Sequence, residues 1–306
     1  MEVHIVSGFL GAGKTTFLNQ YLPLLSGKTV VIENEFGDVG LDGELIRGDI
    51  PVREIYAGCI CCSLAMDFRQ GIKDVAETLK PDQIVIEPSG VGRLSDIIKA
   101  CNKTKEKDAI DLTITKLIAI VDIASFEEYE EGFGTFYLDQ IRHARLLLLS
   151  NLDEISQEKR KIIVERIQRE NPQAILYKED FRKLTPRDLK ELLDRTEDYD
   201  SDSDRMSVPA LPADRIFSSI AIHNPTQKTE EELAILLEKL KKAKYGQVLR
   251  AKGMIQTPNN EILHFNYTAS STDYEEVGIT EENRKDTKVI IIGCELNELP
   301  LKTLFG

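Results

Sequence analysis

Residues 3–16 read VHIVSGFLGAGKTT, and they give the strongest indication of the fold in this chain. Residues 3–7 are rich in β-branched side chains with apolar residues at alternate positions, which predicts a β-strand. Residues 8–15 match the complete phosphate-binding pattern G-x-x-x-x-G-K-[ST]. Apolar residues at helical spacing follow in residues 16–22. Strand, glycine-rich loop and helix form the context in which this pattern binds a phosphate chain, so the sequence predicts a nucleotide-binding domain.

The residue types in this loop suit an anion. Glycines let main-chain N–H groups turn inward around a phosphate, and the helix that follows adds the positive end of its dipole. We expect Lys14 to reach the β- and γ-phosphate oxygens and the Thr15 hydroxyl to bind Mg²⁺. The alternative is a glycine-rich turn without a ligand. The expected nucleotide contacts in this loop are Gly8, Gly11, Ala12, Gly13, Lys14, Thr15 and Thr16.

Composition and charge narrow the class of protein. The chain has 306 residues, of which 42% are hydrophobic and 30% are charged, enough for a large core or two domains. No apolar run approaches the ~20 residues that cross a membrane, and no signal peptide is visible. The net charge of −13 argues against a nucleic-acid groove. We therefore expect a cytoplasmic protein that binds neither nucleic acid nor a membrane.

Strand-like and helix-like segments alternate along the first two thirds of the chain. The strand candidates are mostly continuous apolar runs, as in a parallel sheet that is covered on both faces. Their alternation with helices predicts a doubly wound α/β domain with a mostly parallel sheet. Helices are expected at 156–170 and at 185–194, the second with a capping box formed by Thr185 and Asp188. The strand candidates are residues 3–7, 29–33, 83–87, 116–121, 145–150 and 174–177.

The composition changes at residues 197–214, which read EDYDSDSDRMSVPALPAD. This stretch is acidic, polar and interrupted by two prolines, so it predicts a linker. We therefore expect a nucleotide-binding domain at 1–196 and a smaller domain at 215–306.

The smaller domain is predicted to be an α+β module of ferredoxin-like type. After its first strand, Thr229 and Glu232 form a second capping box, and the helix that they begin is expected to end near Gly246. The expected strands are 216–222, 248–255, 262–267 and 288–294.

Three of the five cysteines, Cys59, Cys61 and Cys62, fall within four residues, whereas Cys101 and Cys294 stand alone. An odd and clustered set is not a secreted disulfide framework and indicates a reducing cytoplasm. Thiolates this close converge on one point and select Zn²⁺, Co²⁺ or Cu⁺. Three sulfur ligands leave a tetrahedral site open to a carboxylate, a water or a partner's side chain. The alternatives are a redox pair or buried structural cysteines.

Two further segments have the positions of nucleotide-sensing loops. Residues 33–38 read ENEFGD and follow the second predicted strand, where phosphate-loop domains usually have their first sensing loop. Residues 84–90 read IVIEPSG, an apolar strand that ends in a carboxylate with a glycine three residues later. Glu87 could hold Mg²⁺ through water or orient the attacking water, and the Gly90 N–H could bond to the γ-phosphate.

Residues 146–153, LLLLSNLD, stand where guanine-binding proteins have an N/T-K-x-D motif. Asp153 could accept both N–H groups on the guanine edge, which adenine lacks. Asn151 occupies the position from which a lysine normally lays its stem across the purine. We therefore expect Ser150, Asn151 and Asp153 to contact a guanine base.

The ordered segments GFLGAGKTT, ENEFG, GCICC, EPSG and SNLD, followed by the α+β module, resemble the CobW-type family of metal-handling GTPases. These are relatives of the nickel chaperones for urease and hydrogenase, and the resemblance covers nearly the whole chain. It implies slow hydrolysis of GTP to GDP, coupled to delivery of a transition metal, Zn²⁺ or Co²⁺, to a client metalloprotein. It also implies catalytic roles for Lys14, Thr15 and Glu87, Mg²⁺ on Thr15 and Glu87, and a transition-metal site formed by Glu33, Cys61 and Cys62 with Cys59 nearby.

The chain departs from the family pattern at three points. Asn151 replaces the usual lysine, Arg145 stands where the family commonly has aspartate, and no histidine-rich loop is present, so bulk metal storage is not expected. Two other functions are considered, a small-molecule kinase on the same nucleotide scaffold and a non-catalytic zinc-sensing regulator. The chain is expected to be a monomer or a homodimer.

Overall fold

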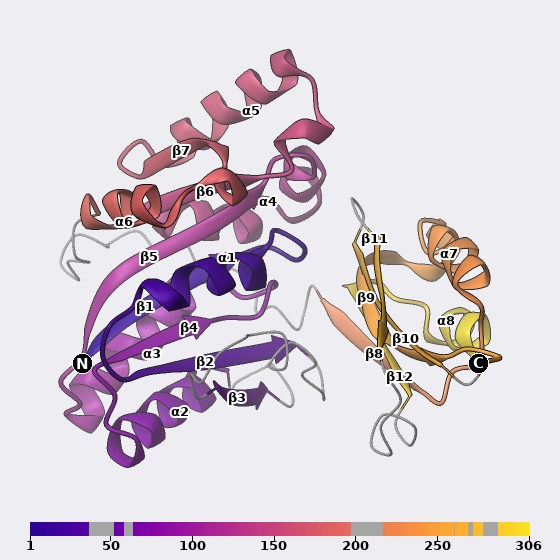
Figure 1. The fold of residues 1–306 in the computed structure, drawn as a ribbon, viewed down its shortest axis with the longest axis horizontal. Helices are drawn as coiled ribbons and strands as arrows, with labels where there is room; N and C mark the ends of the chain where they lie inside the picture. The colour runs from indigo at the N-terminus through magenta and orange to yellow at the C-terminus, as the bar shows by residue number, and fades with distance from the viewer. Residues whose placement is uncertain (37–51, 58–63, 197–216, 260, 269–271, 278–286) are drawn as a thin grey trace. The chain divides into compact units, whose positions relative to one another are not determined.

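The computed structural model describes residues 1–36, 52–57, 64–196, 217–259, 261–268, 272–277 and 287–306. The chain divides into two compact units, each with its own sheet (Figure 1). The predicted linker at 197–214 lies outside the described residues.

The first unit is built on a seven-stranded sheet in the order β3-β2-β4-β1-β5-β6-β7. The pairs from β2 through β7 all run parallel, which confirms the predicted doubly wound sheet. All six strands predicted here are present. The strands are β1 (Glu2–Gly8), β2 (Thr29–Phe36), β3 (Val52–Ala57), β4 (Gln83–Glu87), β5 (Thr113–Asp122), β6 (Leu146–Ser150) and β7 (Ile175–Asp180).

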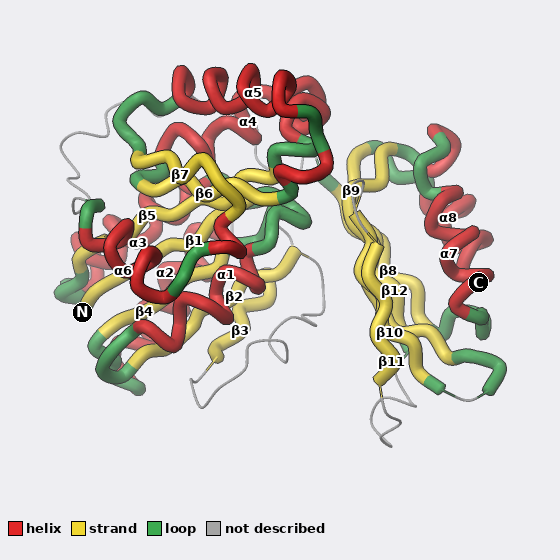
Figure 2. Tube along the Cα trace, turned by 45° about the horizontal axis from the view of Figure 1, so that its top comes forward, coloured by secondary structure: helices red, strands yellow, loops and turns green. Residues whose placement is uncertain are grey.

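Helices cover both faces of this sheet (Figure 2). Helices α1 and α6 pack on one face, where Phe17, Leu189 and Leu193 meet apolar side chains of β1, β2 and β4–β6. Helix α2 packs against α3, α3 against α4 and α4 against α5. The helices are α1 (Lys14–Tyr21), α2 (Leu64–Thr78), α3 (Leu94–Asp108), α4 (Phe126–His143), α5 (Gln157–Glu170) and α6 (Pro186–Asp194).

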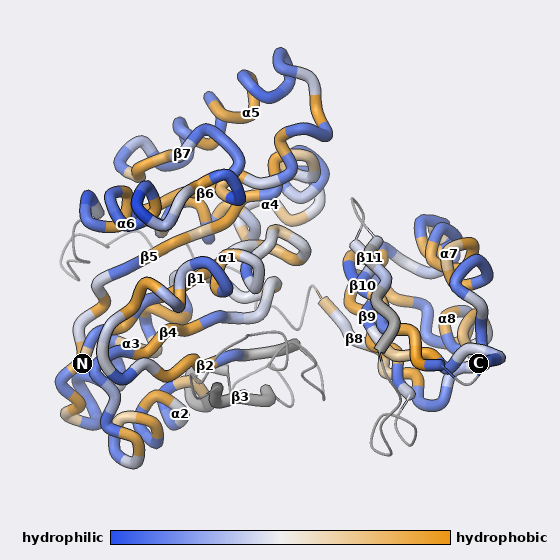
Figure 3. Tube along the Cα trace, viewed as in Figure 1, coloured by the Kyte–Doolittle hydropathy of each residue, from blue (hydrophilic) through white to orange (hydrophobic). Residues whose placement is uncertain are grey.

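The two predicted helix starts in this unit are confirmed. Ser156 caps α5 by accepting a hydrogen bond from the Lys159 N–H, and Thr185 forms a capping box with Asp188 at the start of α6. Along α5, hydrophilic stretches alternate with hydrophobic ones (Figure 3), as expected of a helix that buries one side. No helix among the described residues is long and apolar enough to span a bilayer.

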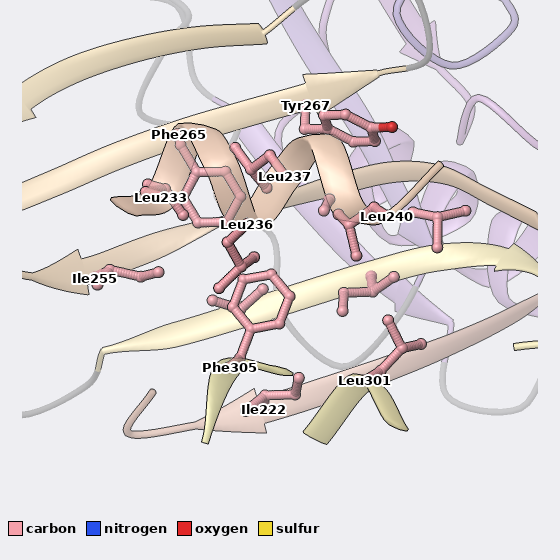
Figure 4. Close-up of a cluster of buried hydrophobic side chains, with 14 of the residues drawn as sticks. Ile222, Leu233, Leu236, Leu237, Leu240, Ile255, Phe265, Tyr267, Leu301 and Phe305 are labelled. Atoms are coloured by element: carbon pink, nitrogen blue, oxygen red, sulfur yellow. The ribbon is translucent and has the colours of Figure 1, made fainter. Parts of the chain in front are cut away.

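The second unit is an antiparallel sheet with two helices, which confirms the predicted α+β module. The strand order is β11-β10-β9-β12-β8, so the last strand lies between β8 and β9. Side chains of α7 and α8 form one core with the sheet, including Leu236, Phe265 and Phe305 (Figure 4). The elements are β8 (Ser218–His223), α7 (Glu230–Lys239), β9 (Gln247–Gln256), β10 (Ile262–Thr268), β11 (Thr272–Val277), β12 (Lys288–Cys294) and α8 (Glu298–Phe305).

Candidate functional site

The phosphate-binding loop leaves β1 at Gly8 and enters α1 at Lys14. Gly13, at the start of α1, has a φ of 101°, a backbone angle that residues other than glycine rarely adopt. A Cβ atom on Gly8 would lie 2.8 Å from the carbonyl oxygen of Ile120 on the neighbouring strand. Both ends of the loop, Gly8 and Gly13, therefore have a backbone path that favours glycine. A main-chain cradle for a phosphate needs such a path.

A buried charge pair lies beside this loop. The Lys14 Nζ atom is 3.9 Å from Oε1 of Glu87, the last residue of β4, and both side chains are largely buried. Since β4 and β1 are parallel neighbours, they end at the same edge of the sheet. That edge is where parallel α/β sheets bind their ligands. A buried ammonium group beside a glycine cradle and a carboxylate fits a site for phosphate and Mg²⁺.

The predicted sensing loop after β4 lies directly on the phosphate-binding loop. A Cβ atom on Gly90 would lie 2.9 Å from the Leu10 main-chain nitrogen. Helix α4 contacts both loops, because the Gln140 side-chain amide donates to the Gly92 carbonyl at 2.7 Å and the Tyr129 hydroxyl donates to the Leu10 carbonyl at 3.4 Å. Gly90 and the phosphate-binding loop are thus held together by one helix.

Glu33, the predicted transition-metal ligand, lies in register with Glu87. The two residues are direct partners in the parallel pair β2–β4, and both are buried. The three clustered cysteines lie outside the described residues. Of the first sensing loop predicted at 33–38, residues 33–36 instead continue strand β2, and residues 37 and 38 lie outside the described part of the chain. Within the part of the chain that is described, no three His, Cys, Asp or Glu side chains form a group that could hold a metal ion.

The expected base-binding residues lie at the end of β6 and directly after it. The Ser150 hydroxyl donates to the Ala12 carbonyl at 2.9 Å, which ties the strand end to the phosphate-binding loop. Asn151 is left-handed, with φ 58°, and leads into the short helix η3 (Leu152–Glu154). Asp153 projects into solvent with 83% of its side chain exposed.

Two features near this site were not predicted from the sequence. Arg182, after β7, donates from Nη2 to the Asn151 side-chain oxygen at 3.2 Å. The hydrogen bonds that this guanidinium donates to Asp180 raise its pKa above its ordinary value. Behind the sensing loop, Arg93 forms a buried ion pair with Asp139 of α4, with 3.1 Å between Nη2 and Oδ2. Neither residue belongs to a sequence motif, so only their spatial neighbours reveal them.

Two family models match the chain. The model for the CobW/HypB/UreG nucleotide-binding domain matches residues 2–178, and the model for the cobalamin synthesis protein cobW C-terminal domain matches residues 217–306.

Individual proteins are also similar. A zinc chaperone CobW of Sinorhizobium sp is 30% identical over 181 residues, 49% of this chain, and this match spans about half (51%) of that protein's length. The zinc chaperone YjiA of Escherichia coli (strain K12) is 28% identical over 323 residues, which cover 100% of this chain and 98% of that protein. A crystal structure of Zn(II)-bound YjiA GTPase from E. coli aligns with a TM-score of 0.44 and 21% identity over 99% of this chain and 97% of that chain.

Proposed function

The chain belongs to the CobW/HypB/UreG nucleotide-binding family, and we propose that it is a GTP-hydrolysing metallochaperone that delivers a transition metal to a client protein. The observation that carries this proposal is the register of β2 and β4. It makes Glu33, the expected metal ligand, the direct neighbour of Glu87, which lies 3.9 Å from Lys14.

The nucleotide half of the mechanism uses residues at the ends of β1 and β4. Lys14 neutralises charge on the β- and γ-phosphates, and the Gly90 N–H bonds to the γ-phosphate. Thr15 and Glu87 would hold Mg²⁺, which supplies further neutralisation of the phosphate oxygens. Glu87 orients the attacking water through its carboxylate. After hydrolysis the γ-phosphate leaves, and Gly90 loses the partner that holds its loop.

The cargo half uses Glu33 and the thiolates of Cys59, Cys61 and Cys62. Zn²⁺ or Co²⁺ is the cargo, since thiolate and carboxylate ligands suit both ions. An odd and clustered set of cysteines supports a cytoplasmic location. We expect a monomer or a homodimer that docks a metalloprotein client.

Two connections couple the halves. The first is the neighbouring pair Glu33 and Glu87 at one sheet edge. The second is the packing of α2 on α3, since α2 begins at Leu64, two residues after Cys62, and α3 begins at Leu94, four residues after Gly90. A movement of the loop at Gly90 can therefore reach the cysteine segment through two packed helices.

The direct test replaces Cys59, Cys61 and Cys62 together by serine in the full chain. Zn²⁺ stoichiometry is measured with a competing chelator, and GTP and ATP turnover are measured with Mg²⁺. We expect the parent protein to bind one Zn²⁺ per chain and to prefer GTP, and the triple variant to lose the Zn²⁺.

Cys294→Ser, in the second unit, is the matched control and should keep the Zn²⁺. Full loading of the triple serine variant would contradict the metal site. A preference for ATP would favour the kinase instead, and a parent protein that binds GTP without turning it over would favour the non-catalytic regulator.

A further inference from the structure

The base-binding segment lacks the side chain that should cover the base. Position 151 is Asn where the N/T-K-x-D motif has Lys, and an Asn side chain is too short to lie across a purine ring. Asn151 also adopts a left-handed backbone, with φ 58° and ψ 34°, directly after β6. A group that covers the base in this chain therefore has to come from another element.

The neighbouring strand supplies such an element. Strand β7 runs parallel to β6, and Asp180 at its end pairs with Leu149. The short helix η4 (Phe181–Lys183) follows at the same sheet edge. A Cβ atom on Gly13 would lie 3.3 Å from the Phe181 ring, so η4 packs against the phosphate-binding loop. On its other side, Arg182 reaches the Asn151 amide oxygen at 3.2 Å.

Hydrogen bonds to a buried carboxylate fix the orientation of Arg182. Its main-chain N–H and its Nε donate to Oδ1 of Asp180 at 2.9 and 2.8 Å, and its Nη2 lies 2.5 Å from Oδ2. Asp180 is 3% exposed, whereas the Arg182 side chain is 47% exposed. A planar guanidinium that is held on one side and open to solvent on the other can stack on an aromatic ring.

We propose that Arg182 stacks on the purine base of the bound nucleotide, in the place of the lysine that the motif lacks. This inference rests on the proposed nucleotide site and assigns separate roles to two of its residues. Arg182 contacts the face of any purine, while Asp153 selects guanine at its edge.

Lys183 is the rival cation in the same segment. Its Nζ lies 3.8 Å from Asp153, and both side chains are mostly exposed, at 63% and 83%. Pairs of this kind are screened by water and hold neither side chain in one place. Arg182, with its several hydrogen bonds to Asp180, is the better-ordered surface for a ring.

The test measures displacement of a fluorescent guanine nucleotide from the full chain by GDP and by IDP, with Mg²⁺ and without Zn²⁺. Arg182→Ala should weaken both diphosphates about tenfold, in the range of a cation–π contact. Arg182→Lys keeps the charge but not the plane, so it should recover only a small part of the loss. Arg187→Ala is the control, because Arg187 lies on the exposed face of α6 and pairs with Glu191. Thermal melting confirms that each variant is folded.

Four results would overturn the assignment, three of which concern the variants. These three are unchanged affinity in Arg182→Ala, full recovery in Arg182→Lys, and a loss that follows Lys183→Ala instead. A loss for GDP without one for IDP would also overturn it, because stacking does not distinguish the two bases. Zn²⁺ is absent from this assay, so the nucleotide affinities are independent of whether the chain delivers a metal. If Arg182 proves not to contact the base, the coupling between nucleotide and Zn²⁺ can still be measured in the separate Zn²⁺ experiment.

Discussion

At the scale of single residues, the site depends on two buried carboxylates on adjacent strands. Glu33 and Glu87 are register partners, and parallel strands lie about 4.8 Å apart. Ionised carboxylates on neighbouring strands repel each other, and burial adds a desolvation cost that bound cations or paired groups offset. Lys14 offsets part of it, at 3.9 Å from Glu87. If the two carboxylates hold Mg²⁺ and the cargo ion as proposed, we expect the binding of one cation to affect the binding of the other.

The close contact between the two loops at Gly90 can be tested by adding a single methyl group there. A Cβ atom there would meet the Leu10 main-chain nitrogen at 2.9 Å and its Cδ2 atom at 2.6 Å. Gly90→Ala should force the two loops apart, lower the free energy of unfolding by about 1–3 kcal/mol and reduce GTP turnover strongly. Chemical denaturation and a phosphate-release assay measure the two effects.

Gly92→Ala is the matched control, because its Cβ atom would come no closer than 3.0 Å to the Ser89 carbonyl oxygen and 3.5 Å to the Pro88 side chain. Its effect on turnover should be smaller. Wild-type turnover in Gly90→Ala would contradict the close contact between the two loops.

At the scale of elements, α4 joins the phosphate-binding loop to the sensing loop. The Phe9 ring packs on Tyr129 and Phe133, with centroids 4.6 and 5.2 Å apart, while Gln140 holds the Gly92 carbonyl. Between these contacts Gly134 breaks the helix, with φ 48° and ψ −123°. The helix is therefore two segments, and the second contacts both loops, because the Tyr137 ring also lies 5.3 Å from the Phe9 ring.

Gln140→Leu removes the donor to the Gly92 carbonyl without a large change in volume. A buried carbonyl that loses its donor costs about 1–3 kcal/mol, so we expect a loss of that size in the free energy of unfolding, with slower GTP turnover. Gln70→Leu makes the same change on an exposed face of α2, where Gln70 bonds to Asp74, and should have little effect. Equal stability of the two variants in urea would contradict a role for Gln140.

The packing of α2 on α3 predicts a pH dependence. Arg69 donates to both carboxylate oxygens of Asp108, at 2.5 and 2.8 Å, and this hydrogen bonding lowers the pKa of Asp108. A carboxyl group whose pKa is lower in the folded than in the unfolded state stabilises the folded protein at pH values above the unfolded pKa, which is roughly 3.9 for Asp. This stabilisation is lost as the pH falls through the folded-state pKa. Asp108→Asn should therefore lower the melting temperature at pH 7.

The difference from the parent protein should begin to narrow near pH 4, roughly the unfolded pKa of Asp, and should close only at the lower pH at which Asp108 is protonated in the folded state as well. Glu77→Gln, on an exposed part of α2, serves as the control and should leave the melting temperature unchanged. A gap for Asp108→Asn that stays constant from pH 7 to pH 3 would show that the ion pair is not its source.

At the scale of the whole molecule, apolar runs predicted every central strand, because strands buried on both faces need them. Two strands, β3 and β11, were not predicted, and they read VREIYA and TDYEEV. Both are end strands of their sheets, and polar residues are typical of such edges. Motif spacing predicted Lys14, Glu87 and Gly90 as candidate residues of the nucleotide site. Arg182 could not be predicted, since its contact with Asn151 depends on how β6 and β7 align.

The central claim is that nucleotide and cargo ion bind to coupled sites. The measurement is the affinity of the full chain for Zn²⁺, by competition with a chelator, once with a non-hydrolysable GTP analogue and once with GDP. We predict that the Zn²⁺ affinities in the two nucleotide states differ at least about tenfold. By reciprocity, the presence of Zn²⁺ should change the affinity ratio of the two nucleotides by the same factor. Equal Zn²⁺ affinities in the two nucleotide states would contradict the account.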